Sequence, residues 1–192
     1  MPEESPAHHV KELRVWIGGL RRVPDKFFEY IPQFTNVDGL HLLGHVGSPS
    51  SLRPSFWKLL QSITSLTINS SVLTIVQIRD IMAQLPHLDN LILSGSPVTV
   101  DRRELPGIGT VVRGRFGGEL TMDGESVGED FVNMLLDIPS GLHFTEARIH
   151  CTHKSLPSAV RLAEACCKTL VKLTHSITFY GKSPLGPVKY KL

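Results

Sequence analysis

The chain has few of the residues that would point to a secreted or nucleic-acid-binding protein. Its 192 residues include three cysteines, Cys151 and the adjacent Cys166 and Cys167, which give neither an even disulfide set nor a Cys-x-x-Cys spacing. We therefore expect reduced, packed thiols. Lys and Arg number 20 and Asp and Glu 18, so the net charge of +2 lacks the basic excess that nucleic-acid binding requires.

Membrane, secretion and metal signals are also missing from the sequence. No apolar run approaches the roughly 20 residues that span a bilayer. The first nine residues carry acids and prolines where a secretion signal would have a basic and then an apolar segment. We expect an intracellular protein, cytoplasmic or nuclear, with no nucleic-acid and no membrane partner. The nine histidines include no helical pair around an acid, so we expect no metal and no cofactor.

What the chain does have is a short apolar pattern that recurs. Two copies that define it lie at Ile63, Leu66 and Ile68 and at Leu88, Leu91 and Leu93. In each copy the last two residues, two apart, share one face of a strand. Between the copies, Thr74 and Gln77 have the form of a helix capping box. Strand, loop, helix and strand thus follow one another within 25 residues, and the two strands are expected to be parallel.

The same pattern extends over most of the chain. Its middle residues are Leu13, Leu40, Leu66, Leu91, Leu120, Ala147 and Ile177, which are 27, 26, 25, 29, 27 and 30 residues apart. A period of about 20 to 29 residues is typical of leucine-rich repeats. We therefore expect an α/β leucine-rich repeat solenoid over residues 10–183, with about seven parallel strands on the concave face and irregular helices on the convex face. The expected helices are 25–31, 55–62, 75–85, 129–138 and 158–170. Residues 1–9 are expected to form a disordered N-terminal tail and residues 184–192 a C-terminal tail.

The amino-acid sequence of several of these segments resembles the leucine-rich repeat part of fungal F-box-type proteins, of the kind abundant in mushroom-forming fungi. The segments that carry this resemblance are 34–42, 66–73, 81–91 and 142–146. In that family an F-box helix bundle binds a ubiquitin-ligase adaptor, and the repeats hold a substrate. The resemblance thus implies that this chain holds a protein, as a ubiquitin-ligase substrate receptor does. Because the first expected strand begins near Val10, it leaves no room for an F-box, and we expect no adaptor binding.

The strand positions that flank each middle residue are expected to face away from the core. We predict that a protein partner of unknown identity binds there, at Arg14, Trp16, His41, Leu43, Thr67, Asn69, Ile92, Thr121, Arg148, His150 and Tyr180. Aromatic residues and arginine dominate the binding energy of protein interfaces. The largest contributions are therefore expected from Trp16, His41, Arg148 and Tyr180. The alternative interpretation is that these are merely solvated strand residues.

One motif points to catalysis instead. Gly124, Ser126 and Gly128 match the Gly-x-Ser-x-Gly nucleophile elbow, between an expected strand and an expected helix. In the repeat, however, Ser126 falls in the loop after the fifth strand, where small polar residues turn the chain. We therefore expect no enzyme and no catalytic residue. A small serine hydrolase built on Ser126, and a truncated repeat protein with no present partner, are the alternative functions.

Overall fold

The computed structural model describes residues 9–16, 36–43, 61–69, 73–94, 112–123, 127–178 and 188–191. Its strands are β1 (Glu12–Trp16), β2 (Gly39–Leu43), β3 (Ser65–Asn69), β4 (Asn90–Ser94), β5 (Glu119–Asp123), β6 (Glu146–Thr152), β7 (Lys172–Thr178) and β8 (Val188–Lys191). The helices of this part are α3 (Ile75–Ala83), α4 (Glu129–Leu136) and α5 (Leu156–Cys166). The strands form one open sheet in sequence order, with β1 to β7 parallel and β8 antiparallel to β7. The predicted α/β class, with seven parallel strands, is confirmed.

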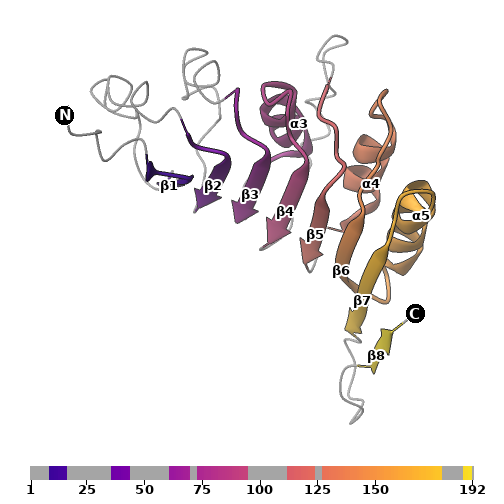
Figure 1. Ribbon diagram of the computed structural model, residues 1–192. Coiled ribbons are helices and arrows are strands. Elements are labelled where there is room, and N and C mark those ends of the chain that lie inside the picture. The colour runs from indigo at the N-terminus through magenta and orange to yellow at the C-terminus, as the bar shows by residue number, and fades with distance from the viewer. Residues whose placement is uncertain are drawn as a thin grey trace, which may run out of the picture.

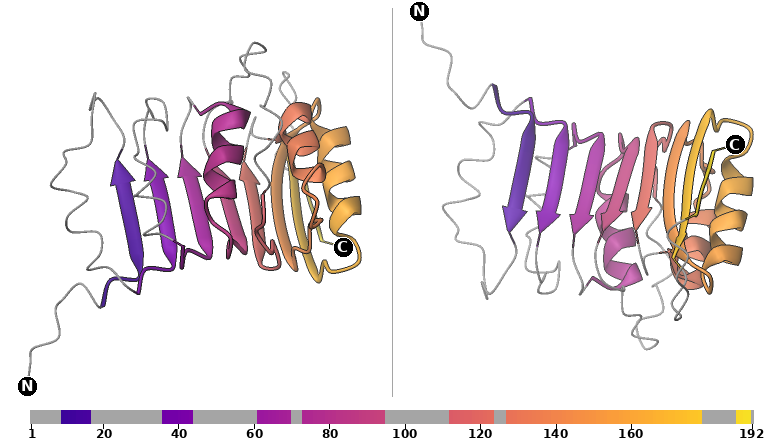
Figure 2. Two further views of the ribbon diagram at one scale, coloured as in Figure 1. Left: turned by 90° about the horizontal axis from the view of Figure 1, so that it is seen from above. Right: turned by 90° about the horizontal axis from the view of Figure 1, so that it is seen from below.

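The two faces of the sheet are covered differently. Figure 1 shows the strands side by side along a curve, with α3, α4 and α5 on its outer side. The views from above and below in Figure 2 place all three helices over one face of the sheet. We call this side the helix face and the opposite side the open face. Since each helix connects two parallel strands that neighbour one another, all the helical crossovers of the described chain have the same hand.

A recurrent hydrogen bond fixes the register of each strand on the next. We call each parallel strand, together with the segment that leads to the next strand, a unit. Just before a strand, one backbone carbonyl accepts the amides of two successive residues that precede or begin the strand of the following unit. The Asp38 carbonyl, for example, accepts the amides of Thr64 and Ser65 at 2.8 and 3.0 Å. Since the same bonds recur from unit to unit, equivalent residues stack in rows. The carbonyls that accept two amides in this way belong to Lys11, Asp38, Thr64, Gly118 and Thr145.

The recurring apolar residues form the core between the sheet and the helices. The first residue of the pattern is almost fully buried in four units, as Val37, Ile63, Leu88 and Phe144. The two strand residues that follow each of these also point to the helix face, where they meet buried helix side chains such as Ile81. Complete burial of one such side chain stabilises the fold by about 1.5 to 3 kcal/mol. The apolar pattern therefore decides which face of each strand is covered.

In the fifth unit, the first apolar residue of the pattern lies one position earlier than predicted. The sequence places Gly117 at its first apolar position, whereas the structure buries Phe116 there completely. Phe116 adopts a positive φ of 49°, an unusual conformation for a bulky residue. Its ring packs edge-on against Phe144, with 5.7 Å between the ring centroids. The backbone conformation thus places the Phe116 side chain at the core position that Gly117, which has no side chain, could not fill.

The seventh strand lies four residues earlier than predicted. Leu173, not Ile177, is paired with Ala147, so the last spacing is 26 residues rather than 30. Leu170, Leu173 and His175 have the same spacing as the predicted Thr174, Ile177 and Phe179. The hydrogen bonds choose the earlier set, because the Thr145 carbonyl accepts the amides of residues 171 and 172. Strand β8 within the predicted C-terminal tail was not foreseen, since it has no copy of the pattern.

The three described helices agree with the prediction to within a few residues. The capping box of α3 is confirmed, since the Thr74 hydroxyl accepts the Gln77 amide at 3.2 Å and the Gln77 side chain accepts the Thr74 amide at 3.0 Å. Helix α5 begins at Leu156, two residues before its predicted start. The predicted helix 25–31 and most of 55–62 lie outside the described residues. In the described chain, no helix combines the length and the apolar character needed to cross a membrane.

Candidate functional site

The open face carries the described residues that were predicted to bind a partner. Because side chains alternate along a strand, residues between two core positions point to the open face. Trp16 is placed by its backbone on β1, in register with Leu43 of β2. Tyr180 lies outside the described residues. The predicted residues whose half-buried or exposed side chains lie on the open face are Arg14, His41, Leu43, Thr67, Asn69, Ile92, Thr121, Arg148 and His150.

The parallel register aligns these positions in rows across the strands. The middle row runs from β1 to β7 through Arg14, His41, Thr67, Ile92, Thr121, Arg148 and Thr174. Its charged and titratable members are all basic. The row on the side where the strands begin contains Glu12, Glu119, Glu146 and Lys172. A row with three glutamates and one lysine therefore runs next to a row whose charged and titratable members are basic.

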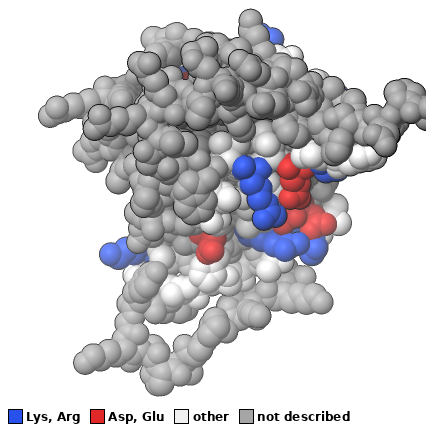
Figure 3. All heavy atoms as spheres, turned by 90° about the vertical axis from the view of Figure 1, so that its left-hand side faces the viewer, with Lys and Arg blue, Asp and Glu red and all other residues white. Residues whose placement is uncertain are grey.

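One group of charges lies at the β1 end of the sheet. The Glu12 carboxylate is 3.5 Å from the Arg14 guanidinium and 3.4 Å from Nε2 of His41 on the neighbouring strand. More than half of the Glu12 and Arg14 side chains is exposed, whereas His41 is 23% exposed. Figure 3, which views the side of the molecule with β1, shows acidic and basic side chains next to each other. Exposed pairs of this kind stabilise a fold little, so they are available to a partner.

A second group of charges joins β5, β6 and β7. Arg148 Nε lies 3.0 Å from a Glu119 carboxylate oxygen, and Lys172 Nζ donates to Glu146 at 2.7 Å. The hydrogen bond and the charge of Lys172 lower the pKa of the exposed Glu146 carboxyl. Thr121 also donates to Glu119 at 2.9 Å. These contacts hold the long side chains in defined positions across three strands.

Between the two charged groups, strands β3 and β4 present an uncharged strip. Thr67 and Ile92, paired in the middle row, are half-buried. The strip contains Ser65, Thr67, Asn69, Asn90, Ile92 and Ser94. An uncharged centre with charged groups on both sides is the arrangement found in many protein interfaces, where charged residues are depleted from the buried core.

Asn90 has a structural role that the sequence did not indicate. Its side-chain oxygen accepts the backbone amide of Glu119 at 2.7 Å. In the other units that amide bonds to a backbone carbonyl, but the spacing from β4 to β5 is the longest in the chain. The Asn90 side chain therefore bridges the place where the 29-residue unit interrupts the recurrent backbone bonds.

His150 is held within the sheet rather than standing free on it. Its Nδ1 is hydrogen-bonded to the Ser176 hydroxyl at 2.5 Å and its Nε2 to the Thr178 hydroxyl at 2.8 Å. Both polar atoms of the ring are thus engaged by β7. A partner at this position would meet the edge of an imidazole that is fixed in orientation.

A thiol and an imidazole meet on the helix face of the same strands. Sγ of Cys151 lies 3.2 Å from Nε2 of His175. Burial raises the pKa of the Cys151 thiol, and burial together with the nearby His150 lowers the pKa of His175. Both shifts favour the neutral forms, so the contact is a thiol–imidazole hydrogen bond without the thiolate that a nucleophile requires. In the part of the chain that the structure describes, no three His, Cys, Asp or Glu side chains are grouped to hold a metal ion.

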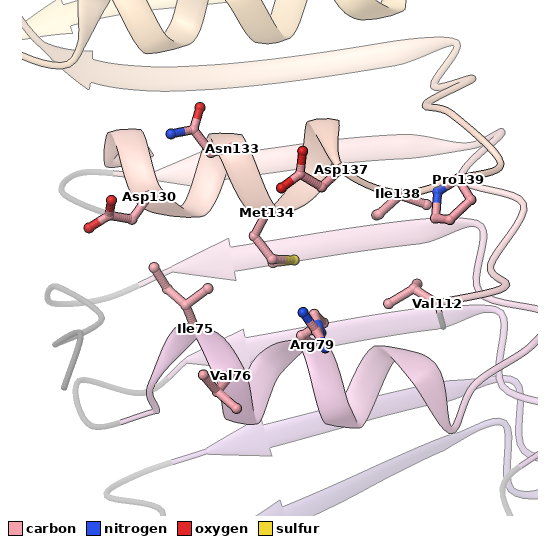
Figure 4. Close-up of a pocket in the computed structure, with 10 residues that line it drawn as sticks. All are labelled: Ile75, Val76, Arg79, Val112, Asp130, Asn133, Met134, Asp137, Ile138 and Pro139. Atoms are coloured by element: carbon pink, nitrogen blue, oxygen red, sulfur yellow. The ribbon is translucent and has the colours of Figure 1, made fainter. Parts of the chain in front are cut away.

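A small pocket lies on the helix face between α3 and α4. Its volume is about 300 Å³, and Figure 4 shows Met134 of α4 projecting into the space between the helices. Arg79 of α3 and Asp137, which directly follows α4, also line the pocket. Asp130 and Asn133 complete its polar lining, which combines one guanidinium with two carboxylates. Sequence reasoning did not foresee this pocket, because its walls come from helices of two different units.

Some open-face residues were missed by the sequence analysis, and one catalytic candidate lies outside the described residues. Lys172 and Thr174 were overlooked because the seventh pattern was set four residues too late. The spacing from Ala147 to Leu173, close to that of the earlier units, was the signal that would have found them. Ser126 lies outside the described residues, so the nucleophile-elbow interpretation stays a sequence hypothesis.

No protein-family model matches this chain, and comparisons with curated proteins and with solved structures find no significant match.

Proposed function

We propose that the chain is a leucine-rich repeat solenoid that binds another protein through the open face of its sheet, without catalysis of its own. The observation that carries this proposal is the alignment of seven strands in register, with their helices on the opposite face. The alignment produces an uninterrupted surface of strand side chains. Solenoids use an extended concave surface of this kind to recognise partners.

The dimensions of the open face favour a protein over a metabolite. Seven parallel strands are separated by six intervals of about 4.8 Å, which gives a width of roughly 29 Å. That width suits a protein–protein interface, in which about 800 Å² is buried on each side. The charged groups at Glu12 and Arg14 and at Glu119 and Arg148 are far enough apart to orient one protein surface. The uncharged strip between them is proposed as the buried centre of the contact.

The sequence resemblance suggests what kind of protein binding this is. Fungal F-box-type proteins hold a substrate on their repeats for ubiquitin transfer, and we extend that role to this chain as a substrate-recognition module. Binding to the ligase adaptor is not part of the proposal. It belongs to the F-box of that family, which has no counterpart among the segments that carry the resemblance.

A quantitative pull-down tests the proposal. The full chain is compared with the double variant Thr67→Arg, Ile92→Asp in a fungal lysate, and captured proteins are counted by mass spectrometry. Since both substitutions lie in the uncharged strip, they should remove the true partner from the captured set. Asp80→Arg, an exposed change on α3, is the matched control and should keep the partner. If the control and the strip variant lose the same proteins, the open face is not the binding surface.

The non-catalytic part of the proposal has its own test. Turnover of activated short-chain esters is measured with the unaltered chain and with Ser126→Ala. We expect no turnover above background in either sample, because the recurring apolar pattern predicts that Ser126 falls in a loop. Turnover that disappears in Ser126→Ala would establish the hydrolase alternative instead.

A further inference from the structure

The arginines of the open face are more exposed than the glutamates that they contact. The Arg14 side chain is 69% exposed and that of Glu12 is 55% exposed. The difference is larger in the second group of charges, where Arg148 is 54% exposed and Glu119 is 31% exposed. A molecule that approaches the open face therefore meets the cationic ends of these pairs before it meets the carboxylates.

The glutamates of the second group already have partners, whereas Arg148 keeps donors for another anion. Glu119 contacts Arg148 and accepts the Thr121 hydroxyl, and Glu146 accepts Lys172 Nζ at 2.7 Å. The Arg148 contact is made by Nε, and a guanidinium has five N–H donors, so donors remain for a second carboxylate. Arginine and carboxylate groups form strong, charge-assisted hydrogen bonds. The open face can therefore bind acidic side chains at its arginines.

The two arginines lie far apart in the middle row of the open face. Arg14 is on β1 and Arg148 is on β6, so five strand intervals of about 4.8 Å separate them by roughly 24 Å along the sheet. Between them the row passes through His41 and then through the uncharged strip. A ligand that contacts both arginines therefore covers the strip and carries two acidic groups about 24 Å apart.

An α-helix fits this surface better than an extended segment. The backbone amides and carbonyls of the parallel strands pair with each other within the sheet. An extended segment that crosses the strands finds no backbone partner on this face, so its own amides and carbonyls would be buried unpaired. A helix pairs these groups internally, and its diameter of about 10–12 Å is less than the roughly 16 Å length of a five-residue strand. The open face also lies on the inner side of the curve that the strands follow, opposite the helices (Figure 1).

We propose that the partner contacts the open face with an acidic α-helix, which lies across the strands along the middle row. This inference rests on the proposed function and specifies the chemistry of the partner surface. Since each residue advances a helix by about 1.5 Å, a length of about 24 Å needs roughly 16 residues. Uncharged side chains of this helix cover the uncharged strip, and an acidic side chain at each end binds Arg14 or Arg148. A nucleic acid carries phosphates along its whole length, so it would place negative charge against Glu12 and Glu119.

A peptide selection on the full chain tests this proposal. The probe is a display library of helical peptides of about 20 residues, in which the positions of one helix face are randomised. Peptides that also bind the double variant Thr67→Arg, Ile92→Asp are discarded, so the retained peptides need the uncharged strip. We expect acidic residues to be enriched at two positions about 14 to 18 residues apart, with uncharged residues between them. Enrichment of basic residues at those positions, retained peptides without a preference for charge, or no retained peptides overturns the proposal.

A charge exchange locates the two ends of a retained peptide. Its Kd, measured by fluorescence anisotropy, should rise at least about tenfold in the double variant Arg14→Glu, Arg148→Glu. A peptide in which lysine replaces both acidic residues should bind this variant more tightly than it binds the unaltered chain, because opposite charges then meet again. Failure of the lysine peptide to regain affinity contradicts the proposed contact.

Two further variants keep this measurement specific. Arg14→Gln, Arg148→Gln removes both charges without a new carboxylate beside Glu119, and it should also raise the Kd of the acidic peptide. Arg161→Glu, Lys168→Glu is the matched control, since it changes the same amount of charge at exposed positions in and just after α5. Circular dichroism verifies that each variant is folded. A control that weakens binding as much as the open-face variants contradicts the proposal.

The selection and the lysate pull-down distinguish failure of this inference from failure of the proposed function. If the strip variant loses a lysate protein but the selection retains no acidic helix, the partner binds the open face in another form. Only the acidic helix is then refuted. If the strip variant and Asp80→Arg lose the same lysate proteins, the proposed function fails, and the inference that rests on it fails as well.

Discussion

Phe116 shows how a single residue completes the core of an irregular unit. Its positive φ turns the side chain inward, where it is fully buried against Phe144. The turn has a steric requirement at Gly114, because a Cβ atom added there would lie 2.7 Å from the Phe116 ring and 3.0 Å from the Leu88 carbonyl oxygen. At Gly117 an added Cβ would meet only Asp89, at an ordinary 3.8 Å. There is therefore room for a side chain at Gly117 but not at Gly114.

Gly114→Ala should lower the free energy of unfolding by about 1 to 3 kcal/mol, because the methyl group overpacks a filled part of the core. Gly117→Ala is the matched control and should change the stability by much less. Urea denaturation of both variants, followed by far-ultraviolet circular dichroism, measures the difference. Equal stability of the two variants would mean that the Phe116 ring does not occupy the described position.

The half-buried His175 makes stability depend on pH in a predictable direction. Its pKa is lowered from 6.5 by burial and by the nearby His150, so the unfolded chain binds a proton more readily than the folded chain. The stability gained from the neutral imidazole is therefore complete above about pH 6.5 and is lost as the pH falls through the folded-state pKa. Cys151, its hydrogen-bond partner, stays a neutral thiol throughout this range because its pKa is raised.

We expect the free energy of unfolding to fall as the pH is lowered below about 6.5 and this fall to be smaller in His175→Gln. His143→Gln, a change at an exposed histidine, should keep the pH dependence of the unaltered chain. Urea denaturation at four pH values gives the slopes. A His175→Gln variant as acid-sensitive as the unaltered chain would show that another group causes the loss.

At the scale of the elements, the sequence patterns predicted the position of a strand correctly where only one set of residues matched the apolar spacing. Strands β2, β3 and β4 follow from the i, i+3, i+5 spacing, and α3 follows from its capping box. The seventh strand was misplaced because two overlapping sets fit the same template. Only the carbonyl of Thr145, a partner from another unit, decides between them. Local spacing carries no information about such long-range hydrogen bonds.

The open face was predictable from the same alternation of side chains, but its internal contacts were not. The pairing of Glu119 with Arg148, which are 29 residues apart in the sequence, needs the register of the sheet. The hydrogen bonds of His150 to β7 likewise depend on the corrected position of that strand. The sequence therefore predicted which residues face outward and not which of them are already paired.

Strands β4 and β5 are joined in part by a side chain, and this makes their contact sensitive to Asn90. Asn90→Ala should destabilise the fold by about 1 to 2 kcal/mol, because the amide of Glu119 loses its acceptor. Asn69→Ala, at an exposed position on β3, should change the stability by no more than about 0.5 kcal/mol. Hydrogen exchange at Glu119 should also become faster in Asn90→Ala. Unchanged exchange at that amide would contradict the bridging role.

At the scale of the whole molecule, the protein divides its two faces between different tasks. The helices and the buried apolar residues occupy one face and hold the strands in register. The open face carries two groups of ion pairs around an uncharged strip, so it offers charge for orientation and a neutral centre for burial. Our proposal assigns partner binding to the open face. Substitutions on the helix face should therefore leave this binding unchanged.

The central claim is that partner binding uses the open face, and titration calorimetry with the captured partner tests it most directly. Arg148→Ala and the double variant Thr67→Arg, Ile92→Asp should each raise the Kd at least about tenfold, or about 1.4 kcal/mol. Val171→Asp and Asp80→Arg, both on the helix face, should leave the Kd unchanged. If the helix-face variants weaken binding and the open-face variants do not, the assignment of the faces is wrong.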